Sequence, residues 1–153
     1  MYIKFLQTAI DGIEKQRSEL EGMAVELIDE YWLEWRMKNA ELKKYSKPGE
    51  FLGGEVAPRA VTRTGKLYLE WLRFSPGRLG KRSKSWGDKI PEGVRGYSAD
   101  SIASRSPDWE RELIERTEKE LALLRGVITV LHESKIKLNR QIRNYIKKEI
   151  QDA

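Results

Sequence analysis

The sequence predicts an α+β fold that is predominantly helical, with two long helices as an antiparallel coiled coil flanking a small antiparallel β-containing basic head. Three observations lead to this prediction. Apolar residues recur at steps of three and four near both ends of the chain, which is typical of one helix face. Between them lies an aromatic and aliphatic segment, residues 66–74, that has strand character. We therefore expect one structural unit with three parts: a long helix over 1–46, a basic head over 47–105 and a second long helix over 106–150.

The first helix is predicted over residues 2 to about 45. Its apolar stripe follows a heptad repeat and comprises Ile3, Leu6, Ile10, Ile13, Leu20, Ala24, Leu27 and Tyr31. Arg17 is the one polar residue in the stripe, and beyond Tyr31 the apolar surface broadens to include Trp32 and Trp35. The helix should stop near residues 48–54, where one Pro and three Gly cannot continue it.

The second helix is predicted to begin with Ser106 as N-cap, Pro107 at the first helical position and Asp108 in the first turn. Its stripe comprises Trp109, Leu113, Leu121, Leu124, Ile128, Leu131, Leu138, Ile142 and Tyr145, with Lys135 as the interruption. Each helix would be about 60 Å long at about 1.5 Å per residue. The two should pair antiparallel within one chain, or in the same way across a homodimer. Arg17 and Lys135 either fix the register of this pairing or extend their charged ends out of a loose end.

The head is predicted to contain a strand over residues 66–74, bounded by Ser, Pro and Gly. Leu67, Leu69 and Trp71 would face one side, and Glu70 would share the other side with Tyr68, Leu72 and Phe74. Segments 60–65 and 83–90 can pair with this strand into a small antiparallel sheet. We expect the head at the end of the helix pair that is far from the chain termini.

Positive charge is concentrated in the head. The net charge is +5 overall, but residues 51–100 hold 10 basic and 5 acidic residues while residues 1–50 hold 8 and 10. Between Arg59 and Lys84, Glu70 is the only acid, which is a local field suited to polyanions. A second basic run, residues 135–148, contains no acid. We predict that the head contacts phosphates of double-stranded DNA through Arg59, Arg63, Lys66, Arg73, Arg78, Lys81, Arg82, Lys84, Trp86, Lys89 and Arg95.

Other classes of protein and site fit the sequence poorly. There is no Cys, and no apolar run is long enough for a membrane span or a signal peptide, so we expect a cytoplasmic protein. The stretch from Gly77 to Ser83 resembles a phosphate-binding loop but lacks its spacing, and we reject that interpretation. His132 is the single histidine and has no second His or Cys for a metal site. We expect no catalytic residue, metal or cofactor, and hence no enzyme.

The five tryptophans divide into two groups. Trp32, Trp35, Trp71 and Trp109 fall within apolar patterns and are predicted to be core residues. Trp86 lies among Lys and Gly residues. Its ring would either stack on a base or sugar or pack against the small sheet, and the sequence favours neither.

Residues 68–125 resemble the MobI-type conjugative transfer proteins of integrative conjugative elements and related plasmids. The positions that carry the resemblance are Trp71, Ile90, Pro91, Gly93, Tyr97, Trp109, Glu110, Glu118 and Arg125. The resemblance implies a relaxosome accessory protein that binds the origin of transfer and assists a relaxase, without catalytic activity of its own. This agrees with the basic head, which is inferred from charge alone.

Two functions follow from these patterns. The first is a DNA-binding accessory factor of conjugative transfer, with the head contacting phosphates and the helices setting spacing or homodimer formation. The second is a coiled-coil adaptor whose basic head binds an acidic protein partner. Steep salt dependence and a preference for one DNA site would favour the first function, and a stable protein partner with weak, unselective DNA binding would favour the second.

Overall fold

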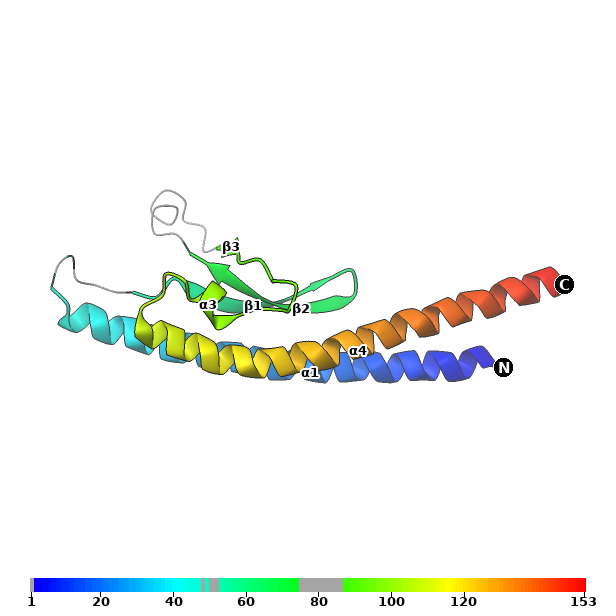
Figure 1. Ribbon diagram of the computed structural model, residues 1–153. Helices are drawn as coiled ribbons and strands as arrows, with labels where there is room; N and C mark the ends of the chain where they lie inside the picture. Colours follow the sequence, from blue (N-terminus) through cyan, green and yellow to red (C-terminus); the bar gives the residue numbers. More distant parts are fainter. Residues whose placement is uncertain (1, 48, 50–52, 75–86) are drawn as a thin grey trace.

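The structure is a computed structural model that describes the chain except for residues 1, 48, 50–52 and 75–86. Its elements in chain order are α1 (Tyr2–Tyr45), β1 (Val56–Arg63), β2 (Lys66–Arg73), β3 (Asp88–Lys89), α3 (Ala99–Ile102) and α4 (Asp108–Asp152). Two long helices and a small antiparallel sheet confirm the predicted α+β, predominantly helical class (Figure 1). Among the described residues, no helix is both long enough and apolar enough to cross a membrane.

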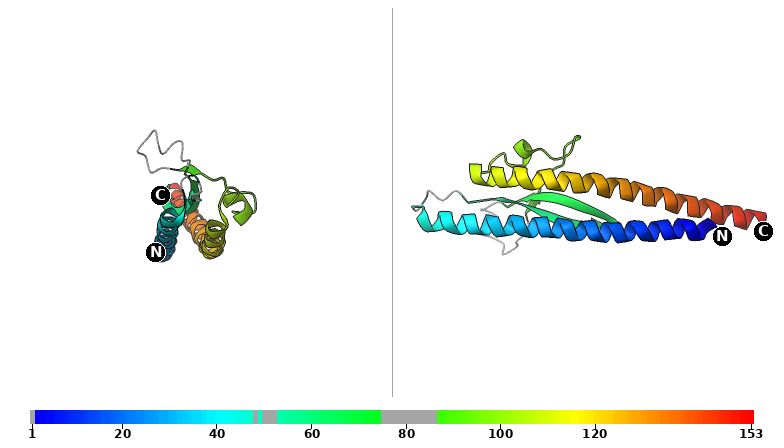
Figure 2. Two further views of the ribbon diagram at one scale, coloured as in Figure 1. Left: turned by 90° about the vertical axis from the view of Figure 1, so that its left-hand side faces the viewer. Right: turned by 90° about the horizontal axis from the view of Figure 1, so that it is seen from below.

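The helices α1 and α4 lie side by side and run in opposite directions, so that both chain termini are at the same end (Figures 1 and 2). At this end the rings of Tyr2 and Tyr145 stack with their centroids 6.1 Å apart. Further along the pair, Tyr31, Leu121 and Ile128 are buried in the core. The helix pairing is therefore made within one chain.

The two basic residues of the apolar stripes share one acidic partner. Arg17 lies 3.2 Å from a Glu14 carboxylate oxygen on its own helix, and Lys135 reaches the other Glu14 oxygen from α4 at 2.5 Å. Lys135 and Arg17 lower the pKa of Glu14 through hydrogen bonds and charge. This ion pair between the helices holds Lys135 opposite Glu14. Of the two roles predicted for Lys135, the structure therefore favours fixing the register of the helix pair over extending the charged end into solvent.

The sheet has the order β1-β2-β3 and is antiparallel throughout. The strands β1 and β2 pair over their full lengths, from Val56 opposite Arg73 to Arg63 opposite Lys66. They are joined by Thr64 and Gly65, both with positive φ, as in the tight hairpin turns that match strand twist. The predicted strand partner began at residue 60, whereas β1 begins four residues earlier and includes Pro58. A proline fits there because β1 is an edge strand.

The sheet packs along the side of the helix pair, over the half that is far from the chain termini (Figure 1), so the prediction names the correct half of the pair but is wrong in placing the head at its tip. Figure 2 shows the sheet seated over both helices when the molecule is viewed along them. Leu67, Leu69 and Trp71 face the helices and are buried. These three side chains need apolar cover, and the middle of the helix pair supplies it through residues such as Tyr31, whose ring lies edge-on to Trp71 with centroids 5.4 Å apart.

The start of α4 differs by one residue from the prediction. Pro107 is the N-cap residue and not the first helical residue, and it makes no side-chain capping bond. The Ser106 hydroxyl was expected to cap the helix, but it donates instead to the Glu110 carboxylate at 2.6 Å. Ser106 thus supplies a polar partner to Glu110, which is buried and needs one.

The prediction that four tryptophans belong to the core is confirmed. Trp71 is fully buried, and Trp32, Trp35 and Trp109 are partly buried and pack against the same core cluster. Trp86 lies outside the described residues.

Candidate functional site

The face of the sheet that points away from the helices carries a group of basic side chains, which we call the outer basic face: Arg59, Arg63, Lys66 and Lys89. Strand register brings them together. Arg59 is opposite Glu70, and Arg63 is opposite Lys66. Lys89 is opposite Leu72, which lies two residues from Glu70 on the same face. Residues from three strands thus converge around the single carboxylate of Glu70.

Glu70 is held by three of these cations. Its carboxylate lies 2.7 Å from one Arg63 nitrogen and 2.9 Å from another, so that Arg63 binds it with two parallel hydrogen bonds. Lys89 lies at 2.9 Å and Arg59 at 3.1 Å. The hydrogen bonds from Arg63, together with those from Lys89 and Arg59, lower the pKa of Glu70 to about 2, against the opposing effect of burial. Glu70 is therefore ionised at neutral pH.

Arg59, Arg63 and Lys89 remain partly exposed to solvent while they bind Glu70. The side chain of Glu70 is 3% exposed, whereas Arg59, Arg63 and Lys89 are 30%, 43% and 50% exposed. Lys66 has no ion pair among the described residues, and its ammonium lies 5.3 Å from the centre of the Tyr68 ring. The Arg63 guanidinium also lies near that ring, at 5.6 Å. One carboxylate thus positions an excess of positive charge on an exposed surface.

The remaining predicted site residues lie elsewhere. Arg73 donates hydrogen bonds to the carbonyl oxygens of Ser101 and Ile102 and to the Ser104 hydroxyl, so it connects β2 to the α3 segment. Arg95 is exposed, beyond β3 in the chain. The other predicted residues are outside the described part of the chain: Arg78, Lys81, Arg82, Lys84 and Trp86.

A second polar cluster connects the sheet to α4 and is mostly buried. The Trp71 indole N–H donates to Glu118 at 2.8 Å, and Glu118 accepts two hydrogen bonds of 2.7 Å from Arg125. Arg125 also donates to the Leu69 carbonyl oxygen at 2.8 Å and lies 4.7 Å from the centre of the Tyr97 ring. The Leu69 carbonyl belongs to the open edge of β2, so Arg125 also blocks part of that edge.

The same cluster is closed by the segment before α3. The Tyr97 hydroxyl donates to the Ile90 carbonyl oxygen at 3.0 Å, and the Ile90 N–H donates to the Trp71 carbonyl oxygen at 2.8 Å. Burial raises the pKa of Tyr97, which keeps this hydroxyl protonated as a donor. We call these residues the Trp71–Arg125 cluster. Five of the positions that carry the MobI resemblance lie in it: Trp71, Ile90, Tyr97, Glu118 and Arg125.

Glu110, another of these positions, joins three elements. It is fully buried and has no cationic partner among the described residues. It accepts hydrogen bonds from the Trp35 indole at 2.8 Å and the Val56 backbone N–H at 3.3 Å, besides that from Ser106. Burial raises the pKa of Glu110 despite these bonds. The carboxyl group therefore ties α4 to α1 and to the start of β1.

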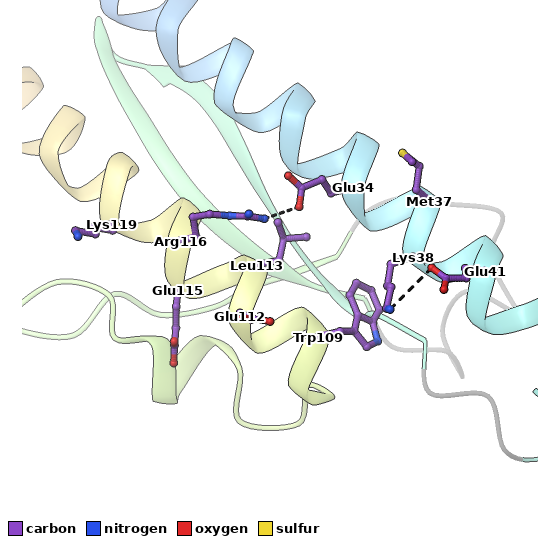
Figure 3. A pocket seen from close by; sticks show the side chains of 10 residues that line it. All are labelled: Glu34, Met37, Lys38, Glu41, Trp109, Glu112, Leu113, Glu115, Arg116 and Lys119. Carbon is purple, nitrogen blue, oxygen red and sulfur yellow. Dashed lines mark hydrogen bonds and ion pairs between the residues drawn. The ribbon is translucent and has the colours of Figure 1, made fainter.

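The described residues also form a large groove and a smaller cavity. The larger, about 840 Å³, is an open groove between the helices (Figure 3), lined by Glu34, Met37, Lys38, Glu41, Trp109, Glu112, Leu113, Glu115, Arg116 and Lys119. Its acidic and basic side chains are interspersed, and Arg116 pairs with Glu34 across it. A smaller cavity of about 160 Å³ lies between β2 and α4, beside Tyr68 and Tyr97. Among the described residues, no group of three or more His, Asp or Glu could hold a metal ion.

From the sequence, Glu70 was interpreted as the only acid in a basic region, and its role as the centre of the outer basic face was not predicted. The sequence does contain a signal for this role. A single acid on a strand, with basic residues nearby on the same face of the sheet, can form ion pairs with several of them at once. The alternation of Glu110, Glu112, Glu115 and Glu118 with Arg and Lys predicts a solvated, salt-bridged helix face, which is wrong for Glu110 and Glu118 because both are buried. Arg125 was interpreted only through the family resemblance.

Comparison with known proteins supports the resemblance. A protein-family model described as MobI protein matches residues 20–139, which is well over half of the chain. No curated protein and no solved structure shows a significant match. The matched range contains the outer basic face and the whole Trp71–Arg125 cluster. The chain therefore belongs to the MobI protein family and is a mobilisation-related protein of conjugative transfer.

Proposed function

We propose that this protein is a DNA-binding accessory factor that recognises the origin of transfer and assists conjugative mobilisation, with a relaxase as its protein partner and without catalytic activity of its own. The observation that carries the proposal is the outer basic face, in which three partly exposed cations surround the Glu70 carboxylate and a fourth, Lys66, lies beside them. Membership of the MobI family supplies the biological context.

The geometry of the face suits phosphate groups. Each guanidinium of Arg59 and Arg63 can present N–H groups to solvent while others bind Glu70. Ion pairs to Glu70 restrict the side-chain rotamers, so less conformational entropy is lost when a phosphate binds. Lys66, next to Arg63 across the hairpin, adds a cation that Glu70 does not neutralise. These features support contacts to the DNA backbone, which give affinity before any base is read.

The cluster residues have a supporting role in this proposal. Trp71, Glu118 and Arg125 face inward and hold the sheet on α4. Their part is to fix the orientation of the outer basic face relative to the helices. Arg95 and the predicted residues of segment 75–86 are further candidate phosphate contacts, proposed from the sequence alone.

An acidic protein is the alternative ligand for the same face. Cations preorganised on a carboxylate could also bind acidic side chains. DNA is favoured because conjugative mobilisation requires recognition of a transfer origin. The two ligands are separable by experiment, because DNA binding should depend steeply on salt and should prefer one origin segment.

The test is fluorescence anisotropy with duplexes tiled across the transfer origin of the element that encodes the protein. The informative variant is R63Q/K66Q, because Arg59 and Lys89 still neutralise Glu70 when Arg63 is removed. R36Q/K119Q is the matched control, since it removes one exposed Arg and one exposed Lys from other parts of the surface.

The proposal predicts that the wild type prefers one tile. R63Q/K66Q should weaken this binding by about tenfold or more and reduce the slope of log K against log salt by about 2, and the control should bind like the wild type. Equal binding to all tiles and to scrambled duplexes, or binding that neither variant changes, would contradict it.

A further inference from the structure

The last turns of α4 carry a row of cations that are not part of the outer basic face. Five of them are exposed: Lys137, Arg140, Arg143, Lys147 and Lys148. None forms an ion pair with another residue in the described ranges, and no acid occurs between positions 135 and 148. We call Lys137, Arg140, Arg143 and Lys147 the α4 stripe. Most of it lies beyond the range matched by the family model, which ends at residue 139.

Two residues of the stripe, Arg143 and Lys147, lie on the side of α4 that the sheet covers further along the helix. An α-helix has 3.6 residues per turn, so residues 18 positions apart point in the same direction. Arg143 is 18 positions after Arg125, whose guanidinium reaches the Leu69 carbonyl of β2. Lys147 is likewise 18 positions after Thr129, which lines the cavity between β2 and α4. Arg143 and Lys147 therefore point toward the sheet side of the molecule.

The sheet ends before it reaches the stripe. The hairpin turn lies beside Lys135, because a side chain added at Gly65 would come within 3.5 Å of the Lys135 ammonium. Beyond this point α4 continues without the sheet, and its final turns extend past the start of α1 (Figure 1). Arg63 and Lys66 stand on either side of the hairpin turn. The outer basic face thus ends where the exposed stripe begins.

We propose that the α4 stripe is a second DNA-backbone contact surface, continuous with the outer basic face, so that one duplex spans both. This inference rests on the proposed function. From Arg59 to the hairpin turn is about 16 Å at ~3.3 Å per strand residue. From Lys135 to Lys147 is about 18 Å at ~1.5 Å per helical residue. The combined surface is therefore about as long as one turn of duplex, roughly 34 Å or 10 base pairs.

The side chains of the stripe favour duplex DNA over a membrane surface. Helices that lie in a membrane interface bury a broad apolar face rich in Trp, Phe and Leu. In this part of α4, Leu138, Ile142 and Tyr145 are partly buried on the α1 side, and the exposed apolar residues Ile136, Ile146 and Ile150 are separate aliphatic side chains without Trp or Phe among them. The stripe itself is interspersed with polar Gln141 and Asn144. A polyanion that needs no apolar insertion fits this surface better.

The experiment compares three full-length proteins: the wild type, the stripe variant K137Q/R140Q/R143Q/K147Q, and the control R36Q/K43Q/K44Q/K119Q. Both variants lose four positive charges at exposed positions, so an effect of net charge alone is the same in each. Anisotropy with the preferred origin duplex gives Kd at several salt concentrations. Circular dichroism and thermal unfolding establish that all three proteins are folded. Sedimentation with phosphatidylcholine vesicles containing phosphatidylserine tests the membrane alternative.

The inference predicts that the stripe variant binds the duplex at least tenfold more weakly than the control at low salt. Its slope of log K against log salt should be smaller by about 2 to 4. Equal Kd values and slopes for stripe variant and control, with wild-type binding intact, would overturn the inference and leave the proposed function standing. Absence of duplex binding by the wild type would remove both. Loss of vesicle binding with unchanged DNA affinity in the stripe variant would assign the stripe to membranes and overturn the inference.

Discussion

Replacing Arg125 with Met tests how the sheet is held on α4. Arg125 makes two hydrogen bonds of 2.7 Å to Glu118 and one of 2.8 Å to the Leu69 carbonyl oxygen. The Arg125 and Glu118 side chains are only 16% and 8% exposed. R125M keeps the packing of the aliphatic stem but leaves a buried carboxylate with the Trp71 indole as its one remaining partner among the described residues. Removing one partner of a buried ion pair costs about 3 to 5 kcal/mol.

We therefore expect R125M to lower the free energy of unfolding by about 3 to 5 kcal/mol and the melting temperature by about 10 °C. Urea unfolding followed by circular dichroism and by tryptophan fluorescence measures the change. R116M is the matched control, because Arg116 and its partner Glu34 are 64% and 54% exposed and such surface pairs contribute about 0 to 1 kcal/mol. The double variant E118Q/R125M buries no charge, so it should be more stable than R125M alone.

A loss below about 1 kcal/mol for R125M, or a loss equal to that of R116M, would refute this reasoning. Strict additivity of E118Q and R125M in a double-mutant cycle would also refute it, because residues that interact directly show a coupling energy.

Three further predictions concern other parts of the molecule. Because the pKa of Glu70 is lowered from 4.5 to about 2, its ion pairs stabilise the fold above pH 4.5 and lose this effect as the pH falls toward 2. The wild type should therefore lose up to about 3 kcal/mol more than E70Q over that range in unfolding measurements, and parallel pH curves would contradict the role of Glu70. G54A should destabilise the fold by about 1 to 3 kcal/mol because its Cβ would overlap the Trp35 indole, whereas G12A, in open space on α1, should stabilise it by about 0.5 to 1 kcal/mol in the same assay. Burial and nearby cations lower the pKa of His132, so its imidazole should titrate below 6.5 in a proton NMR titration, and a midpoint above 6.5 would contradict the structure.

The helices and the central strand could be predicted from the sequence because their signals are local. The spacing of apolar residues predicted both long helices. The alternation of Leu67, Leu69 and Trp71 predicted the buried face of β2. The position of the sheet could not be predicted in this way. It depends on which apolar surface covers Trp71, and that surface is formed by residues distant in sequence, such as Tyr31 on α1.

The candidate site was only partly visible for the same reason. The density of basic residues was apparent, but their partners depend on strand register and tertiary contacts. Arg63 and Arg73 are both arginines of the basic segment between residues 59 and 84. In the structure, however, Arg63 binds Glu70 and Arg73 binds the α3 segment. Glu118 and Arg125 look like members of a solvated helix face, and only the sheet above them makes them a buried pair.

The most direct test of the central claim is the ratio of two dissociation constants at physiological salt, one for a scrambled duplex and one for the preferred origin duplex of equal length. Recognition of the transfer origin predicts a ratio of about 1,000 or more that persists in competitor DNA. A ratio near one would contradict origin recognition and would direct attention to an acidic protein as the ligand of the outer basic face.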